Sequence, residues 1–222
     1  MIAENQRPAR MISHPHKTVF VHIPKCGGQS IEAAFLADLG LSWNERAPLL
    51  LRPNDQPSLG PPRLAHLRAR DYVACHYLSQ ELFDAYFSFA LVRSPFARVL
   101  SFYHYLNPPG TLTQFVQHRL TAAFADKANP KTQHYFLRPQ VDFTENDRGI
   151  PMLDKIFRLE DLATAEAEIR TGSGLKAPIP HANKSERRAS LEDFSRDDVA
   201  VIRALYEQDF EAFGYSDKPR RL

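Results

Sequence analysis

The sequence is poor in the features that mark secreted, membrane-spanning or nucleic-acid-binding proteins. Its 222 residues include only two cysteines, too few for a disulfide framework. No apolar run approaches the roughly 18 residues that a transmembrane helix needs. The 28 Lys and Arg residues nearly balance the 26 Asp and Glu residues, and the net charge is +2. Such a small charge predicts no field that would attract a polyanion, so we expect no nucleic-acid partner.

The N-terminal residues lack the apolar core of a secretion signal, so none is expected. What remains is typical of a soluble globular protein, with 43% apolar and 24% charged residues. The length fits one domain with a sizeable core. We predict a flexible arm over residues 1–16, a single domain over 17–216 and a short tail over 217–222.

Strand and helix patterns alternate along the predicted domain. The predicted strands are 18–23, 71–75, 87–92 and 153–158. The predicted helices are 29–39, 80–86, 95–106, 111–124, 160–170 and 196–213. A long loop rich in Pro and Asn covers 42–63, with room for a short strand near 48–51, and a second loop covers 172–190. This alternation predicts an α/β fold, with a central parallel sheet between helices in a three-layer α/β/α arrangement.

The segment HIPKCGGQS, from His22 to Ser30, has the form of an anion-binding loop. It joins a strand pattern to a helix pattern through two glycines. Glycines let backbone N–H groups approach a phosphate, and the N-terminus of the helix adds partial positive charge. Lys25 and Ser30 supply a cation and a hydroxyl beside these groups.

This loop differs from the Walker A loop of ATP-binding proteins. In a Walker A loop the Lys directly precedes the Ser or Thr. Here Lys25 precedes the glycines and stands five residues ahead of Ser30. We therefore expect the loop to surround one phosphate rather than a triphosphate with its metal. The alternative is a Gly-Gly turn that binds nothing.

A second motif, LVRSPFARVLSFY, covers residues 91–103. Arg93 follows a strand pattern, and Ser94-Pro95 is a favoured start for a helix. Ser94, Arg98, Ser101 and Tyr105 then share one helical stripe. This spacing predicts that Arg93, Ser94 and Ser101 face a second anion. The alternative is a solvated helix face with a surface Arg.

Together the two motifs resemble the sulfotransferases that use 3′-phosphoadenosine 5′-phosphosulfate (PAPS). More narrowly, they resemble the carbohydrate branch that includes the heparan sulfate 2-O-sulfotransferases. Weaker matches at 129–135, 156–162, 181–185 and 206–215 extend the resemblance over about residues 17–216. The resemblance implies a P-loop-like sulfotransferase fold. It also implies transfer of a sulfuryl group from PAPS to a hydroxyl of a carbohydrate-type acceptor, with PAP (adenosine 3′,5′-bisphosphate) as the product.

The resemblance also assigns roles to residues. The residues expected to hold the 5′-phosphosulfate are Pro24, Lys25, Cys26, Gly27, Gly28, Gln29 and Ser30. Arg93 and Ser101 are expected to hold the 3′-phosphate, with Lys184 closing over the nucleotide. Lys25 would stabilise the leaving group, a role that needs no metal ion. Cys26 and Gln29 stand where the family commonly has Thr, which removes hydroxyl groups from the loop.

His76 is the predicted general base, because the resembled branch has a Gly-His near this position. Cys75 replaces that Gly here. Lys25, His76 and Arg93 each follow a predicted strand, so we expect them to meet at one edge of the sheet. A structural histidine is the alternative reading of His76. His22 reads as a packed core residue, and His66, His104 and His134 are weaker candidates for the base. Glu160, at the start of a predicted helix, reads as a helix cap or an ion-pair partner.

Two other functions stay open at this point, an ATP-type nucleotide kinase and a nucleotide-binding module without catalysis. Eukaryotic relatives usually carry a Golgi anchor, and its absence here predicts a cytoplasmic enzyme. Cys26 and Cys75 are expected to be free thiols that lie close together if their strands are neighbours. The sequence names neither the acceptor nor the oligomeric state.

Overall fold

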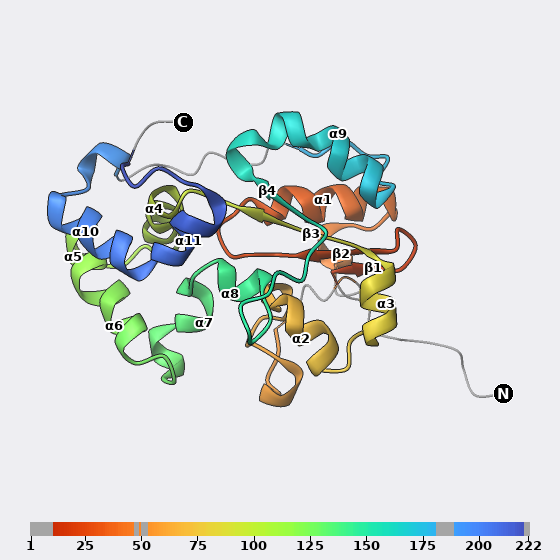
Figure 1. Ribbon diagram of the computed structural model, residues 1–222, viewed down its shortest axis with the longest axis horizontal. Helices are drawn as coiled ribbons and strands as arrows, with labels where there is room; N and C mark the ends of the chain where they lie inside the picture. The colour runs from red at the N-terminus through yellow and green to blue at the C-terminus, as the bar shows by residue number, and fades with distance from the viewer. Residues whose placement is uncertain (1–10, 47–48, 50–52, 181–188, 220–222) are drawn as a thin grey trace.

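A four-stranded sheet, with the strand order β1-β2-β3-β4, organises the computed structural model (Figure 1). The structure describes residues 11–46, 49, 53–180 and 189–219. The strands are β1 (Ile12–Ser13), β2 (Thr18–Val21), β3 (Phe87–Val92) and β4 (Lys155–Arg158). β1 pairs with β2 in the antiparallel sense, whereas β2, β3 and β4 run parallel. The mixed α/β fold and the mostly parallel sheet agree with the prediction.

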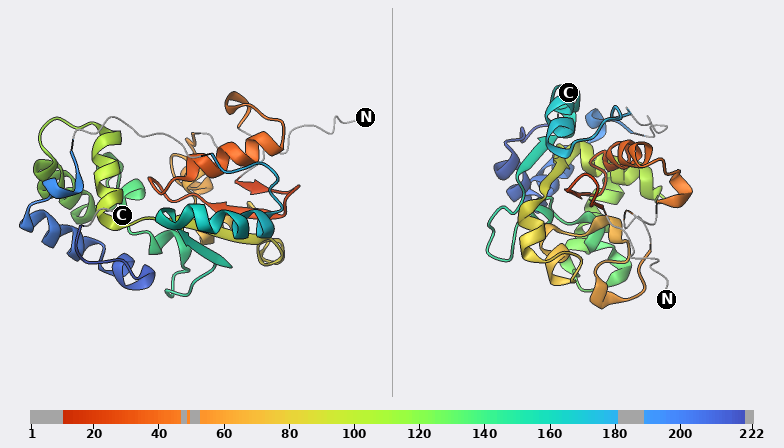
Figure 2. Two further views of the ribbon diagram at one scale, coloured as in Figure 1. Left: turned by 90° about the horizontal axis from the view of Figure 1, so that it is seen from above. Right: turned by 90° about the vertical axis from the view of Figure 1, so that its right-hand side faces the viewer.

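The sheet is covered by helices on both sides. Every residue of β2 is buried, as expected for a strand with no solvent-facing side. Figure 1 shows α1 (Gly28–Asp38) and α9 (Leu162–Ser173) above the strands, and α2 (Ala69–Ala74) and α3 (Gln80–Ala85) below them. The view from above in Figure 2 shows α1 and α9 side by side. The predicted assignment to a three-layer α/β/α class is not established by these four strands and stays a prediction.

Residues 71–75 form a helix, so the predicted strand there is wrong. They belong to α2 and to the turn that follows it. The Asp71 carboxylate accepts hydrogen bonds from the main-chain N–H and the side chain of Arg68, which caps the start of α2. Tyr72 is fully buried and donates its hydroxyl to the main-chain oxygen of Phe20 at 3.2 Å. These contacts outweigh the β-propensity of the short run.

The other predicted helices form with small changes at their ends. α4 spans Pro95–Leu106. The predicted helix over 111–124 is α5 (Leu112–Gln114), a π-helical stretch (Phe115–Leu120) and α6 (Thr121–Ala125). Thr111 caps this run as predicted. The last predicted helix is divided at Tyr206 into α10 (Arg196–Leu205) and α11 (Glu207–Phe213).

Short helical pieces fill the connections. Two short helices, α7 (His134–Leu137) and α8 (Val141–Thr144), precede β4. Among the described residues, the 3-10 turns are Trp43–Glu45, Pro57–Leu59, Leu64–His66, Pro130–Thr132, Leu159–Asp161 and Leu191–Asp193. The short strand expected near 48–51 falls mostly outside the described residues. None of the helices that the structure describes is long and apolar enough to cross a membrane.

Two hydrophobic clusters form the interior. One surrounds the sheet and includes Phe20 and Phe89, whose ring centroids lie 4.9 Å apart. The other lies among α4, α5, α6, α7, α10 and α11, which gather on one side of the sheet in Figure 1. α4 begins where β3 ends, so the second motif joins the two clusters.

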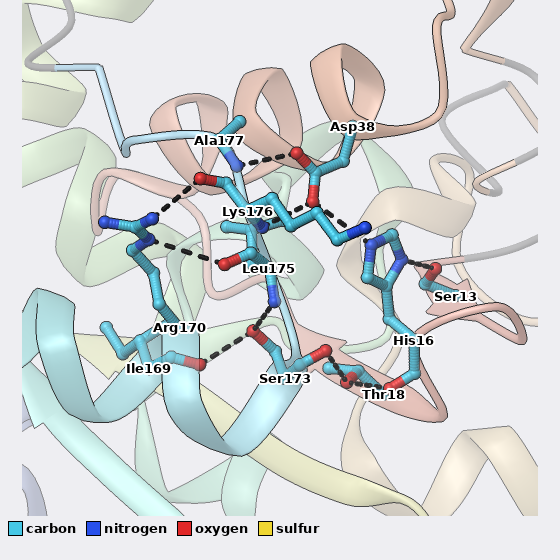
Figure 3. Close-up of polar contacts among 10 residues, drawn as sticks. All are labelled: Ser13, His16, Thr18, Asp38, Ile169, Arg170, Ser173, Leu175, Lys176 and Ala177. Atoms are coloured by element: carbon cyan, nitrogen blue, oxygen red, sulfur yellow. Dashed lines mark hydrogen bonds and ion pairs between the residues drawn. The ribbon is translucent and has the colours of Figure 1, made fainter.

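A polar network fixes the C-terminal end of α1 (Figure 3). The Asp38 carboxylate accepts hydrogen bonds from the main-chain N–H groups of Lys176 and Ala177, both at 2.6 Å. It also lies 3.3 Å from Nε2 of His16, in the turn before β2. This network ties the end of α1 opposite to the glycine loop to the segment that follows α9 and to the turn before β2.

Candidate active site

A single cleft of about 460 Å³ brings the two sequence motifs together. The first motif contributes Lys25, Gly27, Gly28, Gln29 and Ser30 to its wall, and the second contributes Arg93, Ser101 and Tyr105. The other lining residues are His22, Arg63, His66, Phe136, Leu159, Glu160, Leu162 and Ala163. Seven of the predicted site residues therefore share one cavity at the carboxyl ends of β2 and β3.

Five predicted site residues lie elsewhere, and one of them is Ser94, which was expected to face the second anion but does not line the cleft. Pro24 and Cys26 are buried behind the loop and do not line the cleft. His76 is exposed and follows α2 rather than a strand, so the argument that placed it at the sheet edge fails. Lys184 lies outside the described residues.

The glycine loop turns through two left-handed residues before the helix starts. Lys25 has φ 66° and Gly27 has φ 80°. α1 then begins at Gly28, with no side-chain cap and no acidic residue in its first turn. The first N–H groups of a helix lack partners within the helix, and no acidic side chain of this first turn lies beside them. This end of α1 is therefore suited to an anion.

A buried histidine supports the loop from below. A Cβ atom on Gly28 would lie 2.1 Å from Cδ2 of His22, so only glycine fits there. His22 donates a hydrogen bond from Nδ1 to Glu32 Oε1 of α1, and both side chains are buried. His22 is thus the packed, hydrogen-bonded residue that its place on the strand predicts.

Lys25 and Arg93 place two cations on one wall of the cleft. Lys25 Nζ lies 4.2 Å from the centroid of the Tyr105 ring. Arg93 Nη1 donates to the main-chain oxygen of Lys25 at 3.3 Å. Burial, together with the nearby Arg93, lowers the pKa of Lys25 to about 8. A bound anion would stabilise the protonated amine, because it would offset both effects.

His66 stands between the cleft and a second cavity of about 240 Å³. Its Nδ1 lies 3.0 Å from the main-chain oxygen of His22. A carbonyl oxygen can only accept, so Nδ1 carries the proton and Nε2 has the free lone pair. Burial and the neighbouring His22 hold the pKa of His66 well below 6.5, so the ring is neutral at physiological pH. The other residues that line the second cavity are Pro57, Gly60, Pro61, Arg68, Asp71, Cys75, Tyr135, Arg138 and Phe143.

Glu160 caps the start of α4. Ser94 stands at the N-cap position but makes no capping bond with its side chain. Instead Glu160 Oε1 accepts from the main-chain N–H of Ser94 at 2.9 Å, and Glu160 Oε2 accepts from the Tyr215 hydroxyl at 2.9 Å. Glu160 is thus a cap, but of α4 and not, as its position had predicted, of the helix that follows it in the sequence.

Several residues around the cleft lie outside the two sequence motifs. Arg63 and Phe136 line it from distant segments, and Gln140 lies fully buried behind it. Gln140 belongs to no recognisable motif, so only its contacts reveal it. Both cysteines are free thiols, Cys26 in the interior and Cys75 in the second cavity.

Comparison with known proteins assigns the family. The family described as "Sulfotransferase family" matches residues 9–216, nearly the whole chain. Neither the search of curated proteins nor the search of solved structures found a match. The match includes both motifs that line the cleft, and the chain belongs to the sulfotransferase family.

Proposed function

We propose that this protein transfers the sulfuryl group of PAPS to a hydroxyl of a carbohydrate-type acceptor. The observation that carries the proposal is the meeting of two anion motifs in one cleft. PAPS bears a phosphosulfate at the 5′ position and a phosphate at the 3′ position of one nucleotide. The loop 24–30 suits the first group, and Arg93 with Ser101 suits the second.

Lys25 is the proposed stabiliser of the leaving group. In sulfuryl transfer, as in phosphoryl transfer, negative charge develops on the leaving phosphate oxygen. A cation and backbone N–H groups aimed at that oxygen lower the barrier because they are already in place. Lys25 and the N-terminus of α1 both line the cleft where the 5′ group would lie.

We propose His66 as the general base and keep His76, the residue predicted from the sequence, as the alternative. A base must accept the proton of the acceptor hydroxyl, and Nε2 of a neutral His66 has the lone pair to do so. His66 also lines both cavities, whereas His76 lines neither of them. The acceptor would then occupy the second cavity, with its reactive hydroxyl next to His66.

The two alternative functions have less support. A kinase needs a loop for a triphosphate, and the position of Lys25 ahead of the glycines does not fit a Walker A loop. A module without catalysis does not need both a lysine of lowered pKa and a neutral histidine in the same cleft. Such perturbed groups in one cleft favour an enzyme.

A thermal-shift comparison of PAP with ATP and Mg²⁺ tests the donor. A ligand that binds only the folded state raises the melting temperature by mass action. We expect PAP alone to stabilise the protein, after which radiolabelled PAPS would be offered with a panel of neutral and charged sugars. Stabilisation by ATP with Mg²⁺ but not by PAP would overturn the proposal in favour of a kinase. PAP binding with no transfer to any acceptor would favour the module.

A further inference from the structure

Gln140 links the two motifs from behind the cleft. Its side chain is completely buried, with an exposed fraction of 0%. Oε1 accepts hydrogen bonds from the main-chain N–H of Arg93 at 2.8 Å and from Sγ of Cys26 at 3.1 Å. Nε2 donates to the main-chain oxygen of Arg93 at 2.9 Å and to Asp209 Oδ2 at 3.1 Å. All four hydrogen-bonding positions of the amide are used.

The Cys26 thiol is a donor in this arrangement. Burial raises the pKa of Cys26 to about 12, so sulfur keeps its proton at neutral pH. The thiol lies against Gln140, although Cys26 was predicted to help hold the 5′-phosphosulfate. The side chain of Cys26 therefore anchors the loop and leaves contact with the anion to its neighbours.

Asp209 of α11 fixes the orientation of Gln140. Asp209 Oδ1 accepts from the main-chain N–H groups of Gln140 at 2.7 Å and Val141 at 3.1 Å. Asp209 Oδ2 accepts from the amide of Gln140. One carboxylate thus holds both the backbone and the side chain of Gln140, which leaves the amide a single orientation.

We propose that Gln140 is a positioning residue that sets the separation between the two phosphate-binding elements. Through Cys26 it holds the glycine loop, and through both backbone groups of Arg93 it holds the end of β3. The inference rests on the proposed function, because it takes the bound ligand to be a nucleotide with a phosphate at each end. A ligand that bridges two sites gains affinity when their separation is fixed, whereas a ligand of one site does not.

Three nucleotides can test this difference. PAP has both phosphates, adenosine 5′-monophosphate has only the 5′ phosphate, and adenosine 3′-monophosphate has only the 3′ phosphate. Calorimetry would give the Kd of each for the wild type, for Gln140→Met and for the milder Gln140→Asn. We expect PAP to lose on the order of tenfold in affinity in both variants, and each monophosphate to keep its Kd within about twofold.

Gln117→Met is a matched control. Gln117 Nε2 donates to Oδ1 of the buried Asp198 at 2.9 Å, so the variant also breaks an amide–carboxylate contact. This contact lies between the helical run 112–125 and α10, and neither residue lines the cleft. The melting temperature should fall, but the ratio of PAP to monophosphate affinity should stay that of the wild type.

The outcomes separate the inference from the proposed function. If Gln140→Asn weakens the binding of all three nucleotides equally, or of none, the inference is overturned. Gln140 then does not set the separation between the two phosphate-binding elements. If wild-type protein binds PAP no more tightly than either monophosphate, the proposed donor is wrong and the inference falls with it. Should Gln140→Met fail to fold, Gln140→Asn decides, because it keeps the amide and shortens the side chain by one methylene. In turnover, KM for PAPS should rise more than kcat falls.

Discussion

Arg98 Nε donates a hydrogen bond to the main-chain oxygen of Pro24 at 3.0 Å, so a helix of the second motif supports the first motif. Arg98 Nη1 also donates to the main-chain oxygen of Arg138 at 2.8 Å. Arg98 is 1% exposed, and its guanidinium lies near the carboxylate of Asp209. Arg98 therefore braces the glycine loop from the interior. It was predicted to share a helical stripe with Ser101 and Tyr105, but only those two line the cleft.

Replacing this brace should destabilise the whole domain. Arg98→Met removes donors from buried carbonyl oxygens and leaves Asp209 without its neighbouring cation. We expect the free energy of unfolding to fall by about 3 kcal/mol, measured by urea denaturation. Arg203→Met is the control, since Arg203 pairs with Asp217 on the surface, where both side chains are about half exposed. Equal losses in the two variants would contradict the bracing role.

Lys25→Met tests stabilisation of the leaving group. The variant keeps much of the side chain's volume but removes the cation, so kcat should fall by about 10²- to 10³-fold. The melting temperature should change little, because Lys25 is only partly buried. Lys155→Met, which breaks an exposed pair with Glu168, should leave kcat unchanged. A raised KM with normal kcat would instead show that Lys25 only anchors the donor.

The pH dependence of kcat/KM should reveal the protonation state of Lys25. The pKa of Lys25 in the free enzyme is about 8, lowered by burial and by Arg93. Only the protonated amine can stabilise the leaving oxygen, so kcat/KM should decline as the pH rises through about 8. In Lys25→Arg the cation persists at higher pH, and this decline should move out of the accessible range. A profile that is flat to pH 10 in the wild type would rule out a titrating Lys25.

The two motifs could be recognised in the sequence because each is formed by residues that are neighbours in the chain. A strand, a Gly-rich turn and the start of a helix follow one another within residues 18–38, and the second motif repeats the order of strand and helix. Parallel pairing of β2 with β3 then brings both to one edge, as alternating elements predict. Lys25, Ser30, Arg93 and Ser101 therefore line the cleft as expected.

The parts that the sequence did not reveal depend on distant partners. The run 71–75 reads as a strand by composition, yet it is helical, and its Tyr72 donates to the main-chain oxygen of Phe20, 52 residues away. Gln140 is informative only through Cys26, Arg93 and Asp209, which come from three separate segments. Glu160 caps a helix whose N-cap residue, Ser94, stands 66 residues earlier in the chain. Such contacts have no signature in local spacing.

Gly28→Ala should impair the loop without touching any charged residue. The added methyl would meet the His22 ring, and that ring cannot turn away without losing its hydrogen bond to Glu32. We expect the loop to shift and the Kd of PAP to rise by at least about tenfold in calorimetry. Gly40→Ala, where no atom lies within 4 Å, should cost only about 1 kcal/mol of strain from its positive φ. Unchanged PAP affinity in Gly28→Ala would show that His22 yields and that the close contact is unimportant.

A paired comparison of His66→Ala and His76→Ala identifies the general base. If His66 accepts the proton, His66→Ala should lower kcat by about 10²- to 10⁴-fold while PAP still raises the melting temperature. His76→Ala should then retain most activity, since His76 is exposed and lines neither cavity.

The acid side of the pH profile adds an independent check on the base. His66 must be neutral to act, and its pKa lies well below 6.5 because of burial and the nearby His22. Activity should therefore persist below pH 6.5 and decline only at lower pH, as the ring becomes protonated. Loss of transfer in His76→Ala, with normal turnover in His66→Ala, would return the role to His76 and require its loop to approach the cleft when the acceptor binds.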